Sequence, residues 1–373
     1  MTNVIERVLS AARRLGASDV HLKVSLPPIF RIKGDLRTVR DVPPITEEAL
    51  QAFASVAMSE RQKKDYEEFR EVDLAYSASD GSRFRTNVFT QRGLMGMVLR
   101  LIPPEVPPFE SLGLPDVLLK LTQEPRGLIL VTGVTGSGKS TTLAAMLEHI
   151  NRTRACHIVT IEDPIEYAFT DRRSVINQRE LGFDTRSFGR ALRAALRQDP
   201  DVILVGEMRD VETIDIAMLA AETGHLVLST LHTTDAVETV NRIIGAFPPH
   251  QQLQIRLQLA SVLTGAISQR LMPRADGGGM APAVEVLVNT ARVREMIEEP
   301  TRTAEINDAI KEGLHPYGMV SFDQSLTELV RRKIVTYETA AKNATNPDDF
   351  ALFFRGVAGT KDWVDSSSGT FES

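Results

Sequence analysis

The segment GVTGSGKS, residues 133–140, constrains the fold of this chain more than any other feature. It matches the pattern G-x-x-x-x-G-K-[ST], in which glycines let backbone N–H groups turn toward phosphate oxygens. The apolar run GLILVTG (127–133) precedes it, and the helical pattern TTLAAMLEHINR (141–152) follows it. A strand, a phosphate-binding loop and a helix in this order predict an α/β fold with a nucleotide at the end of the strand.

Within this loop each residue type has a defined task. We expect the ammonium of Lys139 to lie against the β- and γ-phosphates and the hydroxyl of Ser140 to bind Mg²⁺. The cofactors implied are therefore ATP and Mg²⁺, and the positive end of the following helix favours the same charges. The predicted nucleotide-binding residues are Gly133, Val134, Thr135, Gly136, Ser137, Gly138, Lys139, Ser140 and Thr141.

An acidic segment, TIEDPIEY (160–167), follows the next predicted strand. It contains Glu162, Asp163 and Glu166, and phosphoryl transfer to water needs a group that positions the water and acids that support Mg²⁺. The alternative is a solvated acidic turn. Its place one strand after the phosphate-binding loop favours the functional interpretation.

A second acid ends an apolar strand in DPDVILVGEMRD (199–210). Glu207 is predicted to support Mg²⁺, because an apolar strand ending in an acid is the usual arrangement beside a phosphate-binding loop. A structural charge pair at the strand end is the alternative.

Two histidines flank the predicted strand in HLVLSTLH (225–232). A single histidine is usually structural, but His225 and His232 enclose one strand and threonines surround the second of them. We expect both to act in catalysis, and His232, at the carboxyl end of the strand, to reach the γ-phosphate.

Several arginines are candidates to complete a neighbouring subunit's site, because a cation supplied from another chain can stabilise the transition state of hydrolysis. One group shares a face of the predicted helix 186–198; it comprises Arg186, Arg190, Arg193 and Arg197. The other group lies on or near a cationic strand face of the first hundred residues; it comprises Arg83, Arg85 and Arg100. A solvated basic face is the alternative for the helix.

The chain is predicted to form two domains. Residues 1–102 have mixed strand and helix patterns, and they begin with a helix whose apolar stripe is predicted to be Val4, Val8, Ala11 and Leu15. The proline-rich segment 103–115 is predicted to be a linker. Residues 116–359 alternate apolar strands with helices and end mainly in helices, and the polar tail 360–373 is predicted to be disordered.

Composition excludes several classes of protein. The 373 residues carry a net charge of −6, which argues against a nucleic-acid partner recognised by overall charge. Cys156 is the single cysteine, so an internal disulfide or a multi-cysteine zinc site is excluded and a reducing cytosol fits. No apolar run reaches the length of a membrane span, so we expect a cytoplasmic protein that contacts the membrane only through partners.

These four motifs together resemble those of the ATPase superfamily that drives type II secretion and type IV pili. GASDVHL (16–22) and RFRTNVF (83–89) resemble parts of the family's PAS-like N-terminal domain, so the resemblance covers about residues 1–350. It implies a RecA-like P-loop ATPase core with a smaller N-terminal α+β PAS-like domain. It also implies that Glu166 is the general base, that Glu207 supports Mg²⁺ and water, and that His232 senses the γ-phosphate. The implied assembly is a homohexamer docked on an inner-membrane pilus platform protein.

Within this superfamily the chain is similar to the pilus retraction branch, the motor of twitching motility, because it lacks the tetracysteine motif and the longer N-terminal region of assembly and secretion motors. YGMVSFDQSL (317–326) fits this branch, whereas TARVREMIEEPTRT (290–303) departs from it and retains only Arg294 of the expected pattern. The alternatives are an accessory retraction paralogue or an assembly or secretion ATPase. From other classes, the alternatives are a nucleic-acid translocase and a non-hydrolysing nucleotide-binding regulator.

Overall fold

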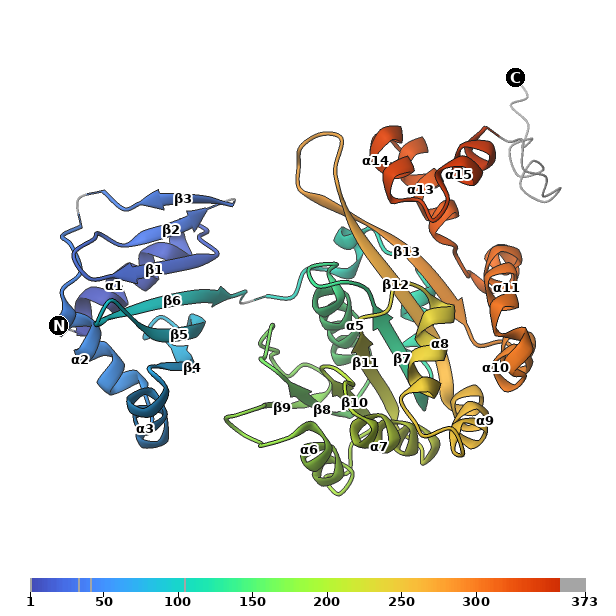
Figure 1. Cartoon of the computed structure of the whole chain (residues 1–373), viewed down its shortest axis with the longest axis horizontal. Helices are drawn as coiled ribbons and strands as arrows, with labels where there is room; N and C mark the ends of the chain where they lie inside the picture. Colours follow the sequence, from blue (N-terminus) through green and yellow to red (C-terminus); the bar gives the residue numbers. More distant parts are fainter. Residues whose placement is uncertain (1, 33, 41, 104, 356–373) are drawn as a thin grey trace. The chain divides into compact units, whose positions relative to one another are not determined.

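The computed structural model describes residues 2–32, 34–40, 42–103 and 105–355 (Figure 1). The predicted tail 360–373 lies outside these residues. The chain divides into two compact units, Met1–Val106 with Glu166–Ala168, and Pro107–Ile165 with Phe169–Ser373.

The first unit contains one antiparallel sheet of six strands, in the order β3-β2-β1-β6-β5-β4. The strands are β1 (Asp19–Lys23), β2 (Ile29–Ile32), β3 (Asp35–Thr38), β4 (Glu71–Ser77), β5 (Arg83–Gln91) and β6 (Leu94–Ile102). The helices are α1 (Thr2–Arg14), α2 (Glu47–Ala57) and α3 (Glu60–Phe69). Ser59 begins α3 with a capping box that it forms with Gln62, which satisfies two backbone donors at the helix start.

The core of this unit lies on one face of its sheet. Alternate residues of the strands, such as Phe84, Met97 and Leu99, are buried there with Leu9 of α1 and Phe53 of α2. Because successive side chains of a strand point to opposite faces, the remaining positions form a second, polar face.

The second unit contains a sheet of seven strands, in the order β13-β12-β7-β11-β10-β8-β9. All neighbours are parallel except β12 and β13, which form an antiparallel pair at one edge. The strands are β7 (Gly127–Thr132), β8 (His157–Glu162), β9 (Val175–Glu180), β10 (Val202–Val205), β11 (Leu226–Leu231), β12 (Leu263–Pro273) and β13 (Met280–Val288).

Helices of this unit connect the strands and then continue beyond the sheet. Before β7 lie η1 (Phe109–Leu112) and α4 (Val117–Leu121), and the connecting helices are α5 (Lys139–Thr153), α6 (Phe188–Ala195), α7 (Val211–Glu222), α8 (Ala236–Gly245) and α9 (Gln252–Val262). After β13 follow α10 (Ala291–Glu298), η2 (Pro300–Glu305), α11 (Ile306–Glu312), α12 (Leu314–Tyr317), α13 (Phe322–Arg331), α14 (Tyr337–Asn343) and α15 (Pro347–Phe354).

The central strands of this sheet are buried on both faces. Every residue of β7 and of β11 is buried, as expected for parallel strands covered by helices on both sides. One face packs against α6, α7, α8 and α9 in a single apolar cluster, and α5 contacts β7 and β11. A smaller cluster joins the far ends of β12 and β13 to α13, α14 and α15.

The proline-rich segment divides between the two units after Val106. Within it, Phe109 and Leu114 are buried, and η1 contacts α5. Its carboxyl-terminal part is therefore packed onto the second unit. Among the helices of the described residues, none has the length and apolar character needed to cross a bilayer.

Candidate active site

The predicted functional segments meet at one edge of the seven-stranded sheet. The phosphate-binding loop follows β7, Glu162 ends β8, Glu207 follows β10 and His232 follows β11. These four strands are parallel, so their carboxyl ends lie at the same edge. This edge is where ligands bind in open α/β sheets.

Lys139 is the first residue of α5 and is buried, with 9% of its surface exposed. Its ammonium donates hydrogen bonds to the carbonyl oxygens of Gly133, at 2.7 Å, and Val134, at 3.0 Å. Burial lowers the pKa of Lys139, and the negative charge of Glu207 opposes that shift. The cation is therefore folded against its own loop, near the acid at the end of β10.

The loop is closed by Gln269, a buried residue of β12 that sequence reasoning missed. A Cβ atom on Gly133 would lie 2.4 Å from the Gln269 carbonyl oxygen, and one on Gly138 would lie 2.7 Å from the Gln269 side-chain nitrogen. Thr142 of α5 donates to the Gln269 Oε1 atom at 2.7 Å. The two glycines are thus required both by backbone angles of positive φ and by the close approach of β12.

The loop fits a bound phosphate chain. Its amides at Gly136, Gly138 and Lys139 make no backbone hydrogen bond among the described residues. The hydroxyl of Ser137 is buried and lacks a partner within the same described part of the chain. Unpaired donors at a helix N-terminus are suited to phosphate oxygens. Val134, Thr135 and Ser140 are exposed, which leaves the outer side of the loop open.

Glu207 is the acid around which the rest of the edge is arranged. Its side chain is 14% exposed, with Oε1 at 2.6 Å from the Arg209 Nε atom and Oε2 at 3.6 Å from the His232 Nε2 atom. Thr230 donates to the carbonyl oxygen of Gly206 at 2.6 Å and so fixes the turn that carries Glu207. The structure therefore brings Glu207 and His232 together. It also places beside them a cation, Arg209, for which the sequence predicted no role.

The acidic segment separates into buried and exposed residues. Glu162 is buried and accepts hydrogen bonds from the Thr160 hydroxyl, at 2.6 Å, and the Gln178 side chain, at 3.1 Å. Asp163 is exposed. Glu166 is exposed in the connection from β8 to β9, and no hydrogen bond or ion pair joins it to another described residue.

His225 does not reach this edge. It precedes β11, so it lies at the amino end of a strand whose carboxyl end carries His232, and a strand of six residues spans roughly 20 Å. Its Nδ1 atom lies 2.8 Å from the carbonyl oxygen of Ala220 in α7. This contact ties His225 to the end of α7, so the side chain has a structural role there. The structure thus separates the two histidines that the sequence grouped.

The arginine-bearing helix is shorter than predicted. Ser187 caps α6, which ends at Ala195, so Arg186 and Arg197 lie outside it. Arg193 forms an ion pair with Glu212 of α7. Arg190 and Arg197 are exposed, and within the described residues their side chains make no hydrogen bond or ion pair.

The arginines of the first unit lie on the polar face of its sheet. Arg85 of β5 stands directly opposite Arg100 of β6, and Arg100 stands opposite Asp19 of β1. The Arg100 Nε atom lies 2.8 Å from the Asp19 Oδ1 atom. Burial acts to raise the pKa of Asp19, yet hydrogen bonds from Ser18 and Arg100 keep it below its usual range. Arg83 lies two residues before Arg85 on the same face, and Arg85 is exposed.

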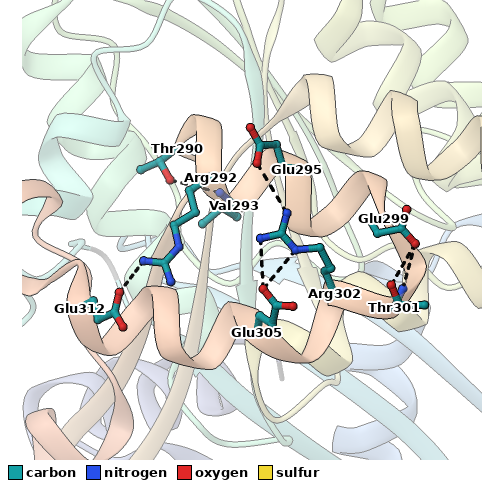
Figure 2. A network of polar contacts seen from close by, with 9 residues as sticks. All are labelled: Thr290, Arg292, Val293, Glu295, Glu299, Thr301, Arg302, Glu305 and Glu312. Atoms are coloured by element: carbon teal, nitrogen blue, oxygen red, sulfur yellow. Dashed lines mark hydrogen bonds and ion pairs between the residues drawn. The ribbon is translucent and has the colours of Figure 1, made fainter.

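The segment 290–303, where the sequence departs from the retraction branch, forms α10 and most of η2. Figure 2 shows its charges paired within this region: Arg292 with Glu312, and Arg302 with Glu295 and Glu305. Arg294 is exposed instead and makes no ion pair among the residues that the structure describes.

The chain is similar to known proteins over most of its length. The family described as Type II/IV secretion system protein matches residues 1–351. The type IV pilus retraction ATPase PilT of Pseudomonas aeruginosa is 44% identical over 93% of this chain and 99% of its own, and the type IV pilus ATPase PilU of that organism is 39% identical over 94% and 91%.

The chain is also similar to solved structures of ATPases over most of its length. The crystal structure of the pilus retraction motor PilT with bound ADP is 46% identical, with a TM-score of 0.85 over 92% of this chain and 98% of that one. The ATPase DotB of Legionella pneumophila has a TM-score of 0.74 at 26% identity, over 94% and 95% of the two chains. The predicted α/β class with a parallel sheet at its core is confirmed, and the chain belongs to the Type II/IV secretion system protein family.

Proposed function

We propose that this chain is an ATP-hydrolysing motor that drives retraction of type IV pili, acting as a homohexamer on an inner-membrane platform protein. The assignment of ATPase activity rests on one observation. Lys139, Glu207 and His232 lie together at the carboxyl edge of the parallel strands, beside a phosphate-binding loop with unpaired amides. Support for retraction comes from the similarity to PilT over almost the whole of both chains.

The residues divide the chemistry as follows. Backbone amides of 133–138 and the Lys139 ammonium hold the phosphates, and Ser140 with Glu207 would hold Mg²⁺, which would supply positive charge against the negative charge that develops in phosphoryl transfer. His232, beside Glu207, contacts the γ-phosphate and so distinguishes ATP from ADP. Glu166 is the proposed general base. Glu162 has a supporting role, because its carboxylate is already occupied by Thr160 and Gln178.

The test of the ATPase is Lys139→Ala, compared with Lys120→Ala on α4. Lys139 supplies the principal cation for the β- and γ-phosphates, so its removal is expected to weaken ATP binding and abolish hydrolysis. Lys120 lies outside the proposed site and is a matched loss of one charge. Wild-type turnover by the Lys139→Ala protein would contradict the assigned site.

The choice between main motor and accessory paralogue needs a cellular test. The segment 290–303 departs from the retraction branch, its Arg292 and Arg302 form ion pairs with glutamates of the same chain, and a second pilus ATPase, PilU, is itself 39% identical to this chain. A main motor is expected to restore twitching to a strain that lacks only its retraction ATPase. Restoration only when another retraction ATPase is present would favour the accessory function.

Location and partners follow from the proposed role. We place the protein in the cytoplasm at the base of the pilus, held at the inner membrane through the platform protein, without a nucleic-acid partner. Stimulation of the ATPase by single-stranded DNA would favour a translocase instead. ATP binding without turnover would favour a non-hydrolysing regulator.

A further inference from the structure

A buried carboxyl group lies on β13, outside the motifs described above. Glu285 is 7% exposed, and its Oε1 atom accepts a hydrogen bond of 2.8 Å from the backbone N–H of Ala236. Ala236 is the first residue of α8. The carboxyl group therefore holds a backbone donor that the helix itself leaves unpaired, at the end of the helix where negative charge is favoured.

The surroundings of Glu285 combine burial with charges of both signs. Asp235 at the start of α8, Arg270 of β12 and Asp323 of α13 all act on it. Of the other elements packed on β13, α11 turns apolar residues inward, including Ile306, and its charged Asp308 and Lys311 pair with each other. Burial raises the pKa of Glu285 to about 7, while the hydrogen bond from Ala236 opposes the shift.

The start of α8 is tied closely to the loop that carries His232. Asp235 caps the helix by accepting from the Glu238 amide at 2.7 Å, and Glu238 accepts in turn from the amide and hydroxyl of Thr234. The hydroxyl of Thr233 lies 2.7 Å from that of Thr239. Residues 233–235 are thus fastened to the first turn of α8, and His232 immediately precedes them.

We propose that Glu285 is a positioning residue for ATP hydrolysis: its carboxylate anchors the N-terminus of α8 and thereby holds His232 beside Glu207. The inference rests on the proposed ATPase function. It adds to that function a contact between the β13 edge of the sheet and the loop that faces the γ-phosphate.

The anchoring depends on the charge of Glu285. An ionised carboxylate accepts a strong hydrogen bond at a helix N-terminus, whereas a protonated one accepts weakly and adds a donor of its own. Protonation therefore loosens the first turn of α8. Because burial raises the pKa of Glu285 to about 7, the anchoring of α8, and with it the position of His232, responds to pH near neutrality.

The test is Glu285→Gln, which keeps the shape and one acceptor but removes the charge. Misplacement of a catalytic group by about 1 Å can cost on the order of 100-fold in rate, so we expect kcat at pH 8 to fall by roughly 10- to 100-fold. The KM for ATP should stay within about twofold, since the phosphate-binding loop is untouched. The pH dependence of kcat between 6 and 8 should also become shallower.

Glu328→Gln is the matched control. Glu328 lies on α13 with 46% of its side chain exposed and pairs with Arg332, so its loss changes the same charge without reaching α8. It should keep the wild-type rate and pH profile. If Glu285→Gln also keeps the wild-type kcat at pH 8, or loses rate with an unaltered pH profile, the positioning mechanism is wrong.

A second measurement on the unmodified chain does not depend on hydrolysis or on how the variant folds. Hydrogen exchange of the Ala236 amide is compared at pH 6 and pH 8 after correction for the intrinsic rate. Protection at least about fivefold greater at pH 8 is expected from the stronger bond of the ionised acceptor. Equal protection at both pH values would overturn the anchoring. Anchoring with no ATPase activity would instead overturn the proposed function and leave this contact standing.

Discussion

Glu207 contacts a guanidinium group and an imidazole ring, and these contacts distinguish its proposed role from that of Glu166. It lies against Arg209 and His232, whereas Glu166 is exposed and unpaired among the described residues. Glu166→Gln should keep ATP affinity and cut turnover by roughly 10²-fold or more, the scale of a lost general base. Glu207→Gln should alter the Mg²⁺ dependence as well. Steady-state kinetics over a Mg²⁺ series would measure both.

The third acid of this group serves as the internal comparison. Glu162 is buried and doubly hydrogen-bonded, so Glu162→Gln should reduce stability more than the catalytic rate per folded molecule. Loss of turnover in Glu162→Gln together with a wild-type rate in Glu166→Gln would mean that the general base has been assigned to the wrong carboxylate.

Gln269 gives a prediction that no motif supplies. Its side chain accepts from Thr142 and contacts the loop at Gly138, so Gln269→Ala would leave the loop unsupported on the β12 side. ATP affinity is expected to fall by about 10-fold, the equivalent of one lost buried hydrogen bond. Gln258→Ala on α9, which removes only a bond to Glu222 near the surface, is the control. Titration with a fluorescent ATP analogue would compare the two, and equal affinities would contradict the support by Gln269.

For individual residues, the sequence predicts those that lie inside contiguous motifs and misses those that distant segments of the chain bring to the site. Lys139 and Glu207 each follow an apolar strand within a short pattern. Gln269 and Glu285 lie on the β12–β13 hairpin, more than 120 residues after the phosphate-binding loop. Their one sequence signal is a polar side chain within an apolar strand, and this signal does not say which loop the side chain will contact.

The elements were predicted well where their pattern is strong and less well at their ends. The four parallel strands around the site follow from buried apolar runs. The stripe predicted for α1 is displaced, because Val4 and Leu15 are 42% and 57% exposed while Ile5 and Leu9 are buried. Leu15 lies after the last residue of the helix, and the buried stripe consists of Ile5, Val8, Leu9 and Ala12. The arginine-bearing helix, α6, likewise begins only after its Ser187 cap.

Glu285, on the β12–β13 hairpin, should make the free energy of unfolding depend on pH. The pKa of Glu285 is raised by burial, so the folded chain binds a proton more tightly than the unfolded chain. Stability from this group is therefore fully present at low pH and is lost as pH rises from about 4.5 to above 7. The loss is on the order of a few kcal/mol.

Thermal unfolding at pH 5.5 and pH 8 is the corresponding measurement. The melting temperature of the wild-type chain should fall more over this interval than that of Glu285→Gln, because glutamine does not titrate. The carboxyls whose pKa is lowered, such as Asp19 and Glu6, are ionised throughout the interval and cancel in the comparison. An equal fall in melting temperature for the two proteins would contradict the raised pKa of Glu285.

For the whole molecule the prediction concerns assembly. Arg85 is exposed and has no partner among the described residues, whereas Arg193 is paired with Glu212 of its own chain. If a neighbouring chain completes each site, mixing Lys139→Ala with Arg85→Ala should restore part of the activity, because some interfaces then combine two intact halves. Arg193→Ala should complement less, since the ion pair with Glu212 of α7 holds the Arg193 side chain within its own chain.

ATPase activity measured on size-separated species checks this assembly prediction. Specific activity should rise with protein concentration and follow hexamer formation. A fully active monomer would contradict sites shared between subunits and would leave nucleotide binding unaffected. Arg209, which already lies beside Glu207 in the same chain, would then be the cation to replace.

The order of strands in the second sheet has a consequence for biosynthesis. The phosphate-binding loop follows β7, but its wall is built by Gln269 of β12, which hydrogen-bonds to a threonine 127 residues earlier in the chain. At about 5–20 residues per second, a ribosome needs roughly 6–25 s to add that length. A nascent chain that has passed the entire motif therefore carries an unfinished loop with exposed strand edges. Premature termination after Ser140 but before β12 would leave a product that contains every residue of the motif and lacks Gln269, which closes the nucleotide pocket.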